Sequence, residues 1–325
     1  MELLQIHNSS KNFWVNHCRA LFLCTVLIAL GMSGFPLAVA MEQRTFASPE
    51  KTTKAVVEAL KAHDSNALTA IFGPGSEDLI SSGDPVADAA ERERFISLYV
   101  QKYRLEAQGT DKMILCLGDE DWPFPIPIVK DGEVWRFDTP EGREELLARR
   151  IGRNELSVIQ TCLAYVDAQQ EFALKDNIND GFREYAQEFI SDPGKKNGLY
   201  WKAKEGEEQS PLGPLVAAAQ GKGYTGKPAV GEPIPYHGYY YKILKAQGKN
   251  APGGAYDYVV KGKMIGGFAL VAYPAQYGSS GIMTFIVNQD GVVYQGDLGE
   301  DTGKIAPTMK LFNPDRSWKR VEQEI

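Results

Sequence analysis

Residues 266–299 constrain the fold more than any other part of the sequence. They form apolar runs separated by short turn sequences, and the first run ends at Pro274, which cannot donate a hydrogen bond to a sheet. The turn at 288–291 contains Asp290-Gly291, a pair that favours a tight hairpin because such turns need a positive φ. The pattern predicts an antiparallel meander with strands over 266–274, 282–287 and 292–295.

The first 40 residues have the pattern of a secretory signal peptide. Lys11 and Arg19 precede an apolar core over 21–32, which is followed by Ala-Val-Ala ending at Ala40. The alternative is an uncleaved anchor, but the core is short for a membrane span of about 20 residues. We expect cleavage after Ala40 and a mature chain, 41–325, that is periplasmic or secreted and has no membrane span.

Composition and motifs exclude several classes of function. The net charge of −7 argues against binding to nucleic acid, which attracts basic surfaces. After residue 40 the histidines are His63 and His237, too few and too far apart for a histidine-based metal site or triad. The sequence contains no phosphate-binding or dinucleotide-binding glycine motif. We therefore expect no cofactor, and binding rather than catalysis.

Two cysteines remain after the predicted cleavage. Cys116 lies in an apolar run predicted to be a strand, and Cys162 lies in a predicted helix. In an oxidising compartment they could pair. Both positions suit a small apolar side chain, however, which favours buried free thiols.

Residues 41–140 have the pattern of an α+β domain. Ser48 and Pro49 begin a predicted helix, a second helix covers 85–103, and strands follow over 112–117, 124–129 and 133–137. This order, with "SPEKTTKAVVEALKAHDSNALTAIFGPG" and "IPIVKDGEVWRF", resembles the NTF2-like (cystatin-like) fold, in which helices pack on a curved sheet. Some members bind small ligands or isomerise ketosteroids with an Asp base and a Tyr donor. The resemblance implies a ligand-binding cone at Tyr99, Tyr103, Asp119 and Asp121; the alternative is that 119–121 is a solvated turn and the tyrosines are core.

Residues 141–175 predict one long helix, because apolar residues recur every three and four positions. Gly152 costs about 1 kcal/mol against Ala in a helix interior, so we expect a break there, between the domains 41–140 and 141–325. This helix carries Arg149, Arg150 and Arg153. They indicate either an anion-binding site or a solvated face paired with neighbouring acids, Glu144, Glu145 and Glu155.

The segment after this helix is similar to a calcium-binding loop. Asp176, Asp180 and Glu184 fit ligand positions of such a loop. Ile178 and Gln187 do not, because they stand at positions three and twelve, and position twelve needs a bidentate acid. A polar turn that ends the helix is the alternative. Beyond it, we expect a short helix over 182–190.

Tyrosines are concentrated before the predicted meander. Tyr236, Tyr239 and Tyr241 indicate either an aromatic face for a glycan or ordinary cross-strand packing. The long helix followed by a sheet with "FIVNQDGVVY" resembles the globular domain of type IV pilins and pseudopilins. That resemblance implies a long helix packed on an antiparallel sheet, but the prepilin signal is missing, so we expect no pilus subunit.

Almost the whole mature chain resembles a family of proteins secreted by Gram-negative bacteria, domain of unknown function 2950. The motifs are "GPGSEDLISSGDPVAD", "DEDWPFPIP", "RRIGRNELSVIQTCLAYVDAQ" and "GGAYDYVVKGKMIGGFALVAYPAQYG". The resemblance implies the cell envelope and no particular activity. We therefore expect a non-enzymatic binding protein with an envelope protein or glycan as partner. The alternatives are a small-molecule binder or isomerase in the first domain and a glycan-binding face in the second.

Overall fold

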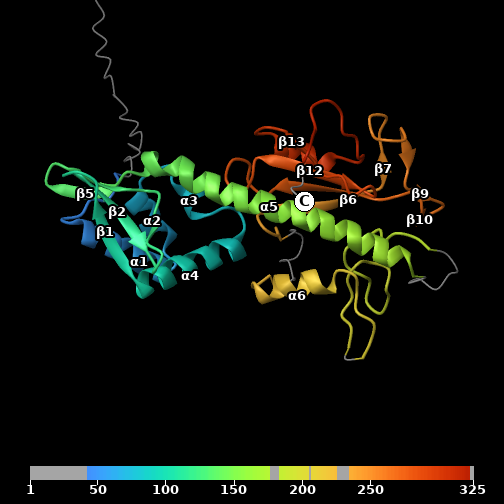
Figure 1. The fold of residues 1–325 in the computed structure, drawn as a ribbon, viewed down its shortest axis with the longest axis horizontal. Coiled ribbons are helices and arrows are strands. Elements are labelled where there is room, and N and C mark those ends of the chain that lie inside the picture. Colours follow the sequence, from blue (N-terminus) through green and yellow to red (C-terminus); the bar gives the residue numbers. More distant parts are fainter. Residues whose placement is uncertain (1–41, 176–182, 205, 225–233, 323–325) are drawn as a thin grey trace, which may run out of the picture. The chain divides into compact units, whose positions relative to one another are not determined.

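The computed structural model describes residues 42–175, 183–204, 206–224 and 234–322. All described residues belong to one compact unit, Met41–Ile325. The first part of this unit, 42–137, contains helices and a sheet, and the second part, from residue 183 onward, contains mainly antiparallel strands (Figure 1). One long helix, 139–173, joins the two parts. The predicted α+β class is confirmed, while the predicted signal peptide lies outside the described residues.

The first part begins with helices whose starts are set by capping residues. The Ser48 hydroxyl accepts a hydrogen bond from the Lys51 N–H at 3.3 Å, and the Asp64 carboxylate accepts one from Ala67 at 2.9 Å. Pro49 occupies the first turn, where its missing N–H is not needed. These helices are α1 (Pro49–Lys61), α2 (Ser65–Phe72), α3 (Glu77–Ile80) and α4 (Pro85–Gln101).

An antiparallel sheet completes the first part, with strand order β1-β2-β4-β5 and β3 paired to β2. The predicted strand at 124–129 is wrong in its bounds, because Pro125 and Pro127 have no N–H for a ladder. The strands are β1 (Tyr103–Ala107), β2 (Lys112–Leu117), β3 (Trp122–Pro123), β4 (Ile128–Asp131) and β5 (Val134–Phe137). Apolar side chains of this sheet and of α1 and α2 form a first core, in which Ile71, Leu115, Ile128 and Phe137 are fully buried.

Helix α5 (Thr139–Ala173) runs without interruption through both parts of the unit (Figure 1). The predicted break at Gly152 is wrong. Space around that glycine is open, and the helix on either side of it is held by a different core. Leu146 packs on the first core, whereas Val158 and Cys162 are fully buried in the second. Burial on both sides outweighs the low helix propensity of one glycine.

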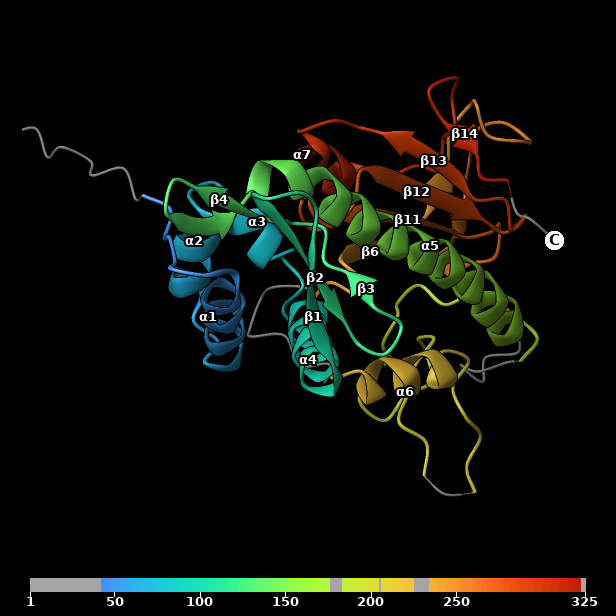
Figure 2. The ribbon, with the colours of Figure 1, turned by 60° about the vertical axis from the view of Figure 1, so that its left-hand side comes forward.

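The second part contains the predicted meander. Strands β11 (Ala269–Pro274), β12 (Met283–Asn288) and β13 (Tyr294–Asp297) pair antiparallel in chain order, and Gly291 has φ +72° in the turn. The full order is β14-β13-β12-β11-β6, with β6 (Tyr239–Leu244) and β14 (Lys319–Arg320) at the edges. Figure 2 shows α5 lying across this sheet, where it contacts β11 and β12.

The remaining elements of the second part are short. They are α6 (Gly213–Gly221), α7 (Thr302–Ile305), the 3-10 turn Ala306–Thr308, and the strand pairs β7 (Ala246–Gln247) with β8 (Tyr256–Asp257) and β9 (Val259–Val260) with β10 (Lys263–Met264). The helix expected over 182–190 is wrong for its described residues: Tyr185 bridges Met264 and Ile190 bridges Tyr200 instead. Among the described residues, no helix has the length and apolarity that a bilayer crossing requires.

Both cysteines are buried and free, as the sequence predicted. Burial is also the main reason that the pKa of each thiol is raised, to about 12 for Cys162. Since the thiolate is the reactive form, both are structural side chains.

Candidate functional site

A cavity of about 670 Å³ lies between α4 and α5. Its floor is made of apolar side chains of the first core, including Val56, Leu68, Phe124 and Ile126, which are almost fully buried. Its rim is made of charged side chains on the two helices, of which Glu91, Glu93, Arg94, Arg149 and Arg153 are exposed. The volume falls within the range of about 300–1,000 Å³ that is usual for ligand pockets.

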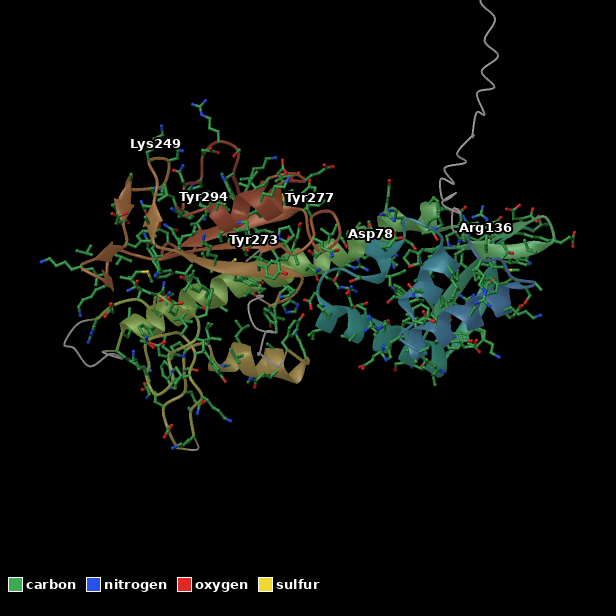
Figure 3. The ribbon with its side chains drawn as sticks, turned by 180° about the vertical axis from the view of Figure 1, so that it is seen from behind. Asp78, Arg136, Lys249, Tyr273, Tyr277 and Tyr294 are labelled. Atoms are coloured by element: carbon green, nitrogen blue, oxygen red, sulfur yellow. The ribbon has the colours of Figure 1, made fainter. Side chains whose placement is uncertain are left out.

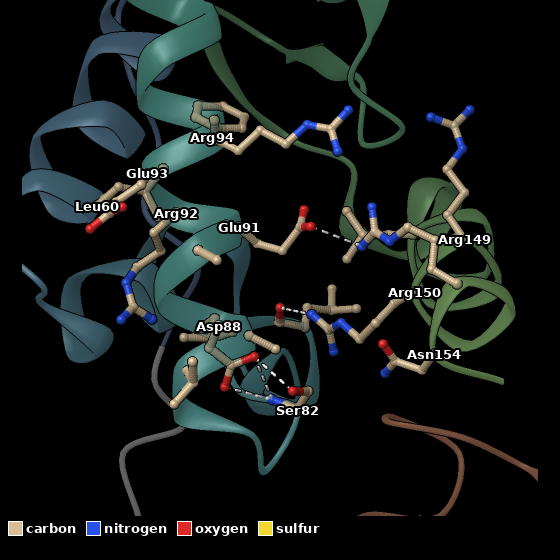
Figure 4. A pocket seen from close by; sticks show the side chains of 18 of the residues that line it. Leu60, Ser82, Asp88, Glu91, Arg92, Glu93, Arg94, Arg149, Arg150 and Asn154 are labelled. Atoms are coloured by element: carbon tan, nitrogen blue, oxygen red, sulfur yellow. Dashed lines mark hydrogen bonds and ion pairs between the residues drawn. The ribbon is translucent and has the colours of Figure 1, made fainter. Parts of the chain in front are cut away.

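Helix α4 forms one wall of this cavity. It packs on the first core through Phe95 and Leu98, yet none of its 17 residues, all of them described, is fully buried. The residues that line the cavity from this helix include Ala87, Glu91 and Arg94, which follow one another at helical spacing and so share one face. In Figure 4, the Glu91 and Arg94 side chains reach from α4 towards α5.

Helix α5 forms the opposite wall with three arginines that differ in their contacts. Arg150 donates to the carbonyl oxygens of Asp78 and Leu79, each at 2.6 Å, and burial lowers its pKa. Arg153 forms an ion pair with Glu91 of α4 at 3.2 Å. Arg149 is paired with Glu145 at 2.6 Å within α5, and its guanidinium carbon lies 5.4 Å from the centre of the Trp122 ring.

The sequence predicted that these arginines pair with the neighbouring acids Glu144, Glu145 and Glu155, and the structure confirms this for one pair. Arg149 is paired with Glu145, but Glu155 accepts hydrogen bonds from the Ile282 and Met283 N–H groups instead. The arginine cluster was thus a sequence signal for this site. The α4 side was missed, although its Glu-Arg-Glu-Arg run at 91–94 places opposite charges beside the apolar residues of one helix.

The cavity is more positive than the protein as a whole. Among the described residues, six basic and three acidic side chains line it, whereas the chain has a net charge of −7. The basic ones are Arg92, Arg94, Arg149, Arg150, Arg153 and Lys222; the acidic ones are Asp88, Glu91 and Glu93. A local excess of positive charge beside an apolar floor suits an anion with an apolar body.

Asp84 fixes the N-terminus of α4 to the second part of the unit. One of its oxygens caps the helix by accepting from Val86 at 3.1 Å and from Ala87 at 3.0 Å. The other accepts from the Tyr224 hydroxyl and the Gly238 N–H, both at 2.8 Å. Asp84 is fully buried, so these contacts hold one end of the cavity wall in place.

His237 and Tyr224 close the same end of the cavity. The Tyr224 hydroxyl accepts from the backbone N–H of His237 at 3.4 Å, and the centres of the two rings lie 6.3 Å apart. Burial, and then the nearby Lys222 charge, lower the pKa of His237, which favours the neutral ring. Burial has the opposite effect on Tyr224, whose pKa it raises, because the charged form of a tyrosine is the deprotonated one. Both side chains are therefore uncharged near neutral pH.

A second junction lies at the loop after β11. The Ser279 hydroxyl donates to the Asp78 carbonyl at 3.1 Å and lies 3.3 Å from Arg150. Asn154 of α5 donates to the Ser280 carbonyl at 2.8 Å. Figure 3 shows Asp78 and Tyr277 on the two sides of this junction. The loop therefore holds α3 and α5 in the positions that shape the cavity.

The residues predicted for a cone in the first domain come together elsewhere. Tyr99 and Tyr103 stack with ring centres 4.3 Å apart, and burial followed by the Tyr103 hydrogen bond raises the pKa of Tyr99 to about 12. Asp121 pairs with Lys102 and Arg104, whose hydrogen bonds lower its pKa, and the exposed Asp119 accepts from Gln101. These residues gather at the far end of α4, and the cavity walls do not include them.

Of the tyrosines predicted for a glycan face, Tyr239 is buried, whereas Tyr236 and Tyr241 are partly buried. Tyr239 is fully buried and donates to the Met283 carbonyl at 2.9 Å. Tyr236 packs against His237, with ring centres 4.3 Å apart, and its carbonyl accepts from the Tyr241 hydroxyl at 3.2 Å. Burial raises the pKa of all three. Tyr239 has no surface to offer a ligand.

Of the predicted calcium ligands, Asp176 and Asp180 lie outside the described residues. Glu184 is buried, and its carboxylate lies 3.9 Å from the Lys263 ammonium group. Within the part of the chain that the structure describes, no group of three His, Cys, Asp or Glu side chains is placed to hold a metal ion.

Fold and site together define an α+β protein with an apolar cavity bordered by arginines. A family model described as Protein of unknown function (DUF2950) matches residues 43–321, and the chain belongs to this family. No curated protein and no solved structure matches the chain. The resemblances to NTF2-like and pilin domains stay predictions.

Proposed function

We propose that the chain is a periplasmic or secreted protein that binds a small amphipathic molecule in the cavity between α4 and α5. The observation that carries the proposal is the cavity itself, with an apolar floor and a charged rim. A folded protein normally fills such a space with side chains, because interiors are close-packed. An apolar cavity of this size is therefore the feature of the described unit most suited to a ligand.

Binding is favoured over the isomerase-like alternative. Isomerisation needs an acid or base aimed at the bound molecule. Of the acids that line the cavity, Asp88 accepts hydrogen bonds from Ser82, Glu91 is paired with Arg153, and Glu93 points away from α5 in Figure 4. The Tyr224 hydroxyl donates to Asp84, and the His237 ring packs against Tyr236. The glycan alternative is disfavoured by the burial of Tyr239.

The binding proposal is tested with a neutral apolar probe. Titration of the mature protein, 41–325, with N-phenyl-1-naphthylamine is expected to give saturable fluorescence enhancement. Ala87→Trp, which adds a large side chain to the cavity wall, is expected to weaken probe binding at least about ten-fold by filling the space. Ala148→Trp is the control, because Ala148 is exposed on α5 and does not line the cavity. Absence of saturable binding, or equal loss in both variants, would reject the cavity as the site.

The envelope location is tested separately. Expression of the full chain with a C-terminal tag is expected to yield a protein whose first residue is Met41, recovered from the periplasm or the medium. N-terminal mass spectrometry of each cell fraction measures this. A full-length chain that stays in the cytoplasm would refute the location without touching the binding proposal.

A further inference from the structure

We propose that the molecule bound in this cavity carries an anionic oxygen headgroup, a carboxylate or a phosphate, on an apolar body, and that Arg94 with Arg149 binds the headgroup. The inference rests on the proposed binding function and adds the chemical class of the ligand. It follows from which of the cavity's cations are already engaged and which are not.

Several of the basic side chains are committed to the fold. Arg150 holds the Asp78 and Leu79 carbonyls and is largely buried. Arg153 ties α5 to α4 through Glu91. Arg92 points away from α5 in Figure 4, although its Nε is buried without a hydrogen-bond partner. Using any of these for a ligand would mean breaking a contact of the protein or turning a side chain around.

Arg94 is in a different position. Within the described part of the chain, its side chain makes no hydrogen bond, ion pair or ring contact, and it is exposed at the rim. The Lys222 side chain also lacks such a contact there, but its charge lies at the His237 end of the cavity, and an ammonium group has no planar fork of donors. In Figure 4 the Arg94 guanidinium group reaches across the space towards α5. A guanidinium group offers a planar fork of donors that matches a carboxylate or a phosphate. Arg94 is therefore free to bind an anion without loss to the fold.

Arg149 is the second contact from the opposite wall. Its ion pair with Glu145 joins exposed side chains four residues apart on one helix, and such pairs contribute only about 0.3–0.5 kcal/mol. A ligand anion can replace Glu145 at little cost. The stacking on Trp122 holds the guanidinium group at the edge of the apolar floor, which Trp122 also lines. Headgroup and apolar body would then be bound side by side.

Charge selects the sign of the ligand. The cavity has twice as many basic as acidic side chains among the described residues, so a cationic amphiphile would meet repulsion where an anionic one meets attraction. The rest of the protein carries a net negative charge, so the positive rim is a local feature that attracts an anion. A neutral amphiphile would gain only from the apolar floor.

Competition among amphiphiles that share a ten-carbon chain and differ in headgroup tests the headgroup assignment. N-phenyl-1-naphthylamine bound to the mature protein is displaced with decanoate, decyl phosphate, decanol or decyltrimethylammonium, each below its micelle threshold. We expect each anion to displace the probe at a concentration about ten-fold or more below that of decanol, and the cation to be the weakest. Either order of the two anions supports the proposal, and the stronger one identifies the headgroup.

Arginine variants then locate the contact. R94Q and R149Q are each expected to weaken displacement by the better anion about ten-fold and to leave displacement by decanol unchanged. R316Q, an equal charge change at an exposed arginine that does not line the cavity, should change neither. If the probe binds and decanol competes as well as the anions, or if R94Q behaves as R316Q does, the headgroup assignment is wrong and the binding function stands. If the neutral probe does not bind, the binding function itself fails.

Discussion

Replacing Asp84 with alanine is expected to lower the free energy of unfolding by about 3 kcal/mol, because the variant leaves several donors without their partner. The wild-type carboxyl group is fully buried and accepts from the Val86 and Ala87 N–H groups of α4. It also accepts from the Tyr224 hydroxyl and the Gly238 N–H, which belong to the second part of the unit. The variant loses a helix cap and a connection between the two parts together.

Urea unfolding followed by circular dichroism measures this effect, with Asp64→Ala as the matched control. Asp64 caps α2 in the same way, but it is exposed, and its carboxylate accepts only from Ala67 among the described residues. Its loss should cost about 1 kcal/mol, the usual value for a helix cap. If the two variants lost the same stability, the contacts of Asp84 with the second part would have no energetic role.

The second large effect is expected at Gly142, near the start of α5. A Cβ there would lie 2.4 Å from the Pro125 carbonyl oxygen and 2.5 Å from the Ile126 Cα, both backbone atoms that cannot turn aside. Gly142→Ala is expected to lower the free energy of unfolding by about 2–3 kcal/mol, because α5 must move off the strand connection at 124–127. Ile126 lines the cavity floor, so the variant should also weaken probe binding.

Gly152→Ala is the matched control in the same helix. The space around Gly152 is open, and no positive φ holds the glycine there. Alanine should therefore raise the free energy of unfolding by about 0.5–1 kcal/mol, through its higher helix propensity. The shift of the urea midpoint at constant m-value measures the change in unfolding free energy for Gly142→Ala and for Gly152→Ala. Loss of stability in Gly152→Ala would indicate that the helix needs flexibility at this point, and an unchanged Gly142→Ala would show that α5 shifts freely.

The two glycines illustrate what sequence reasoning reached and what it missed. Gly152 was noticed because a glycine inside a helical pattern lowers helix propensity, and the break expected there is wrong. Gly142 gave no signal, although it is the glycine that α5 requires for close packing. Propensity is a local property, whereas close approach depends on a segment elsewhere in the chain.

The site was predictable only in part for a related reason. The arginines of α5 stand together in the sequence, so a basic cluster was recognisable there. Their counterparts on α4 are remote in the sequence, and the helix spacing alone did not show which face of α4 would meet α5. The named tyrosines and aspartates near residues 99–121 do lie together, but beside the far end of α4 and outside the cavity.

By itself the sequence determined the α+β class, the long helix and the meander. Asp290-Gly291 sets a turn with its own backbone, and apolar spacing sets the buried face of each strand or helix, so these features need only neighbouring residues. The tertiary structure alone decided that there is a cavity and which charges border it. Asp84 and Gly238 meet across 154 positions, and the loop holding Ser279 reaches Asp78 across 201. Such contacts depend on how the helices and sheets pack, and no local pattern encodes that packing.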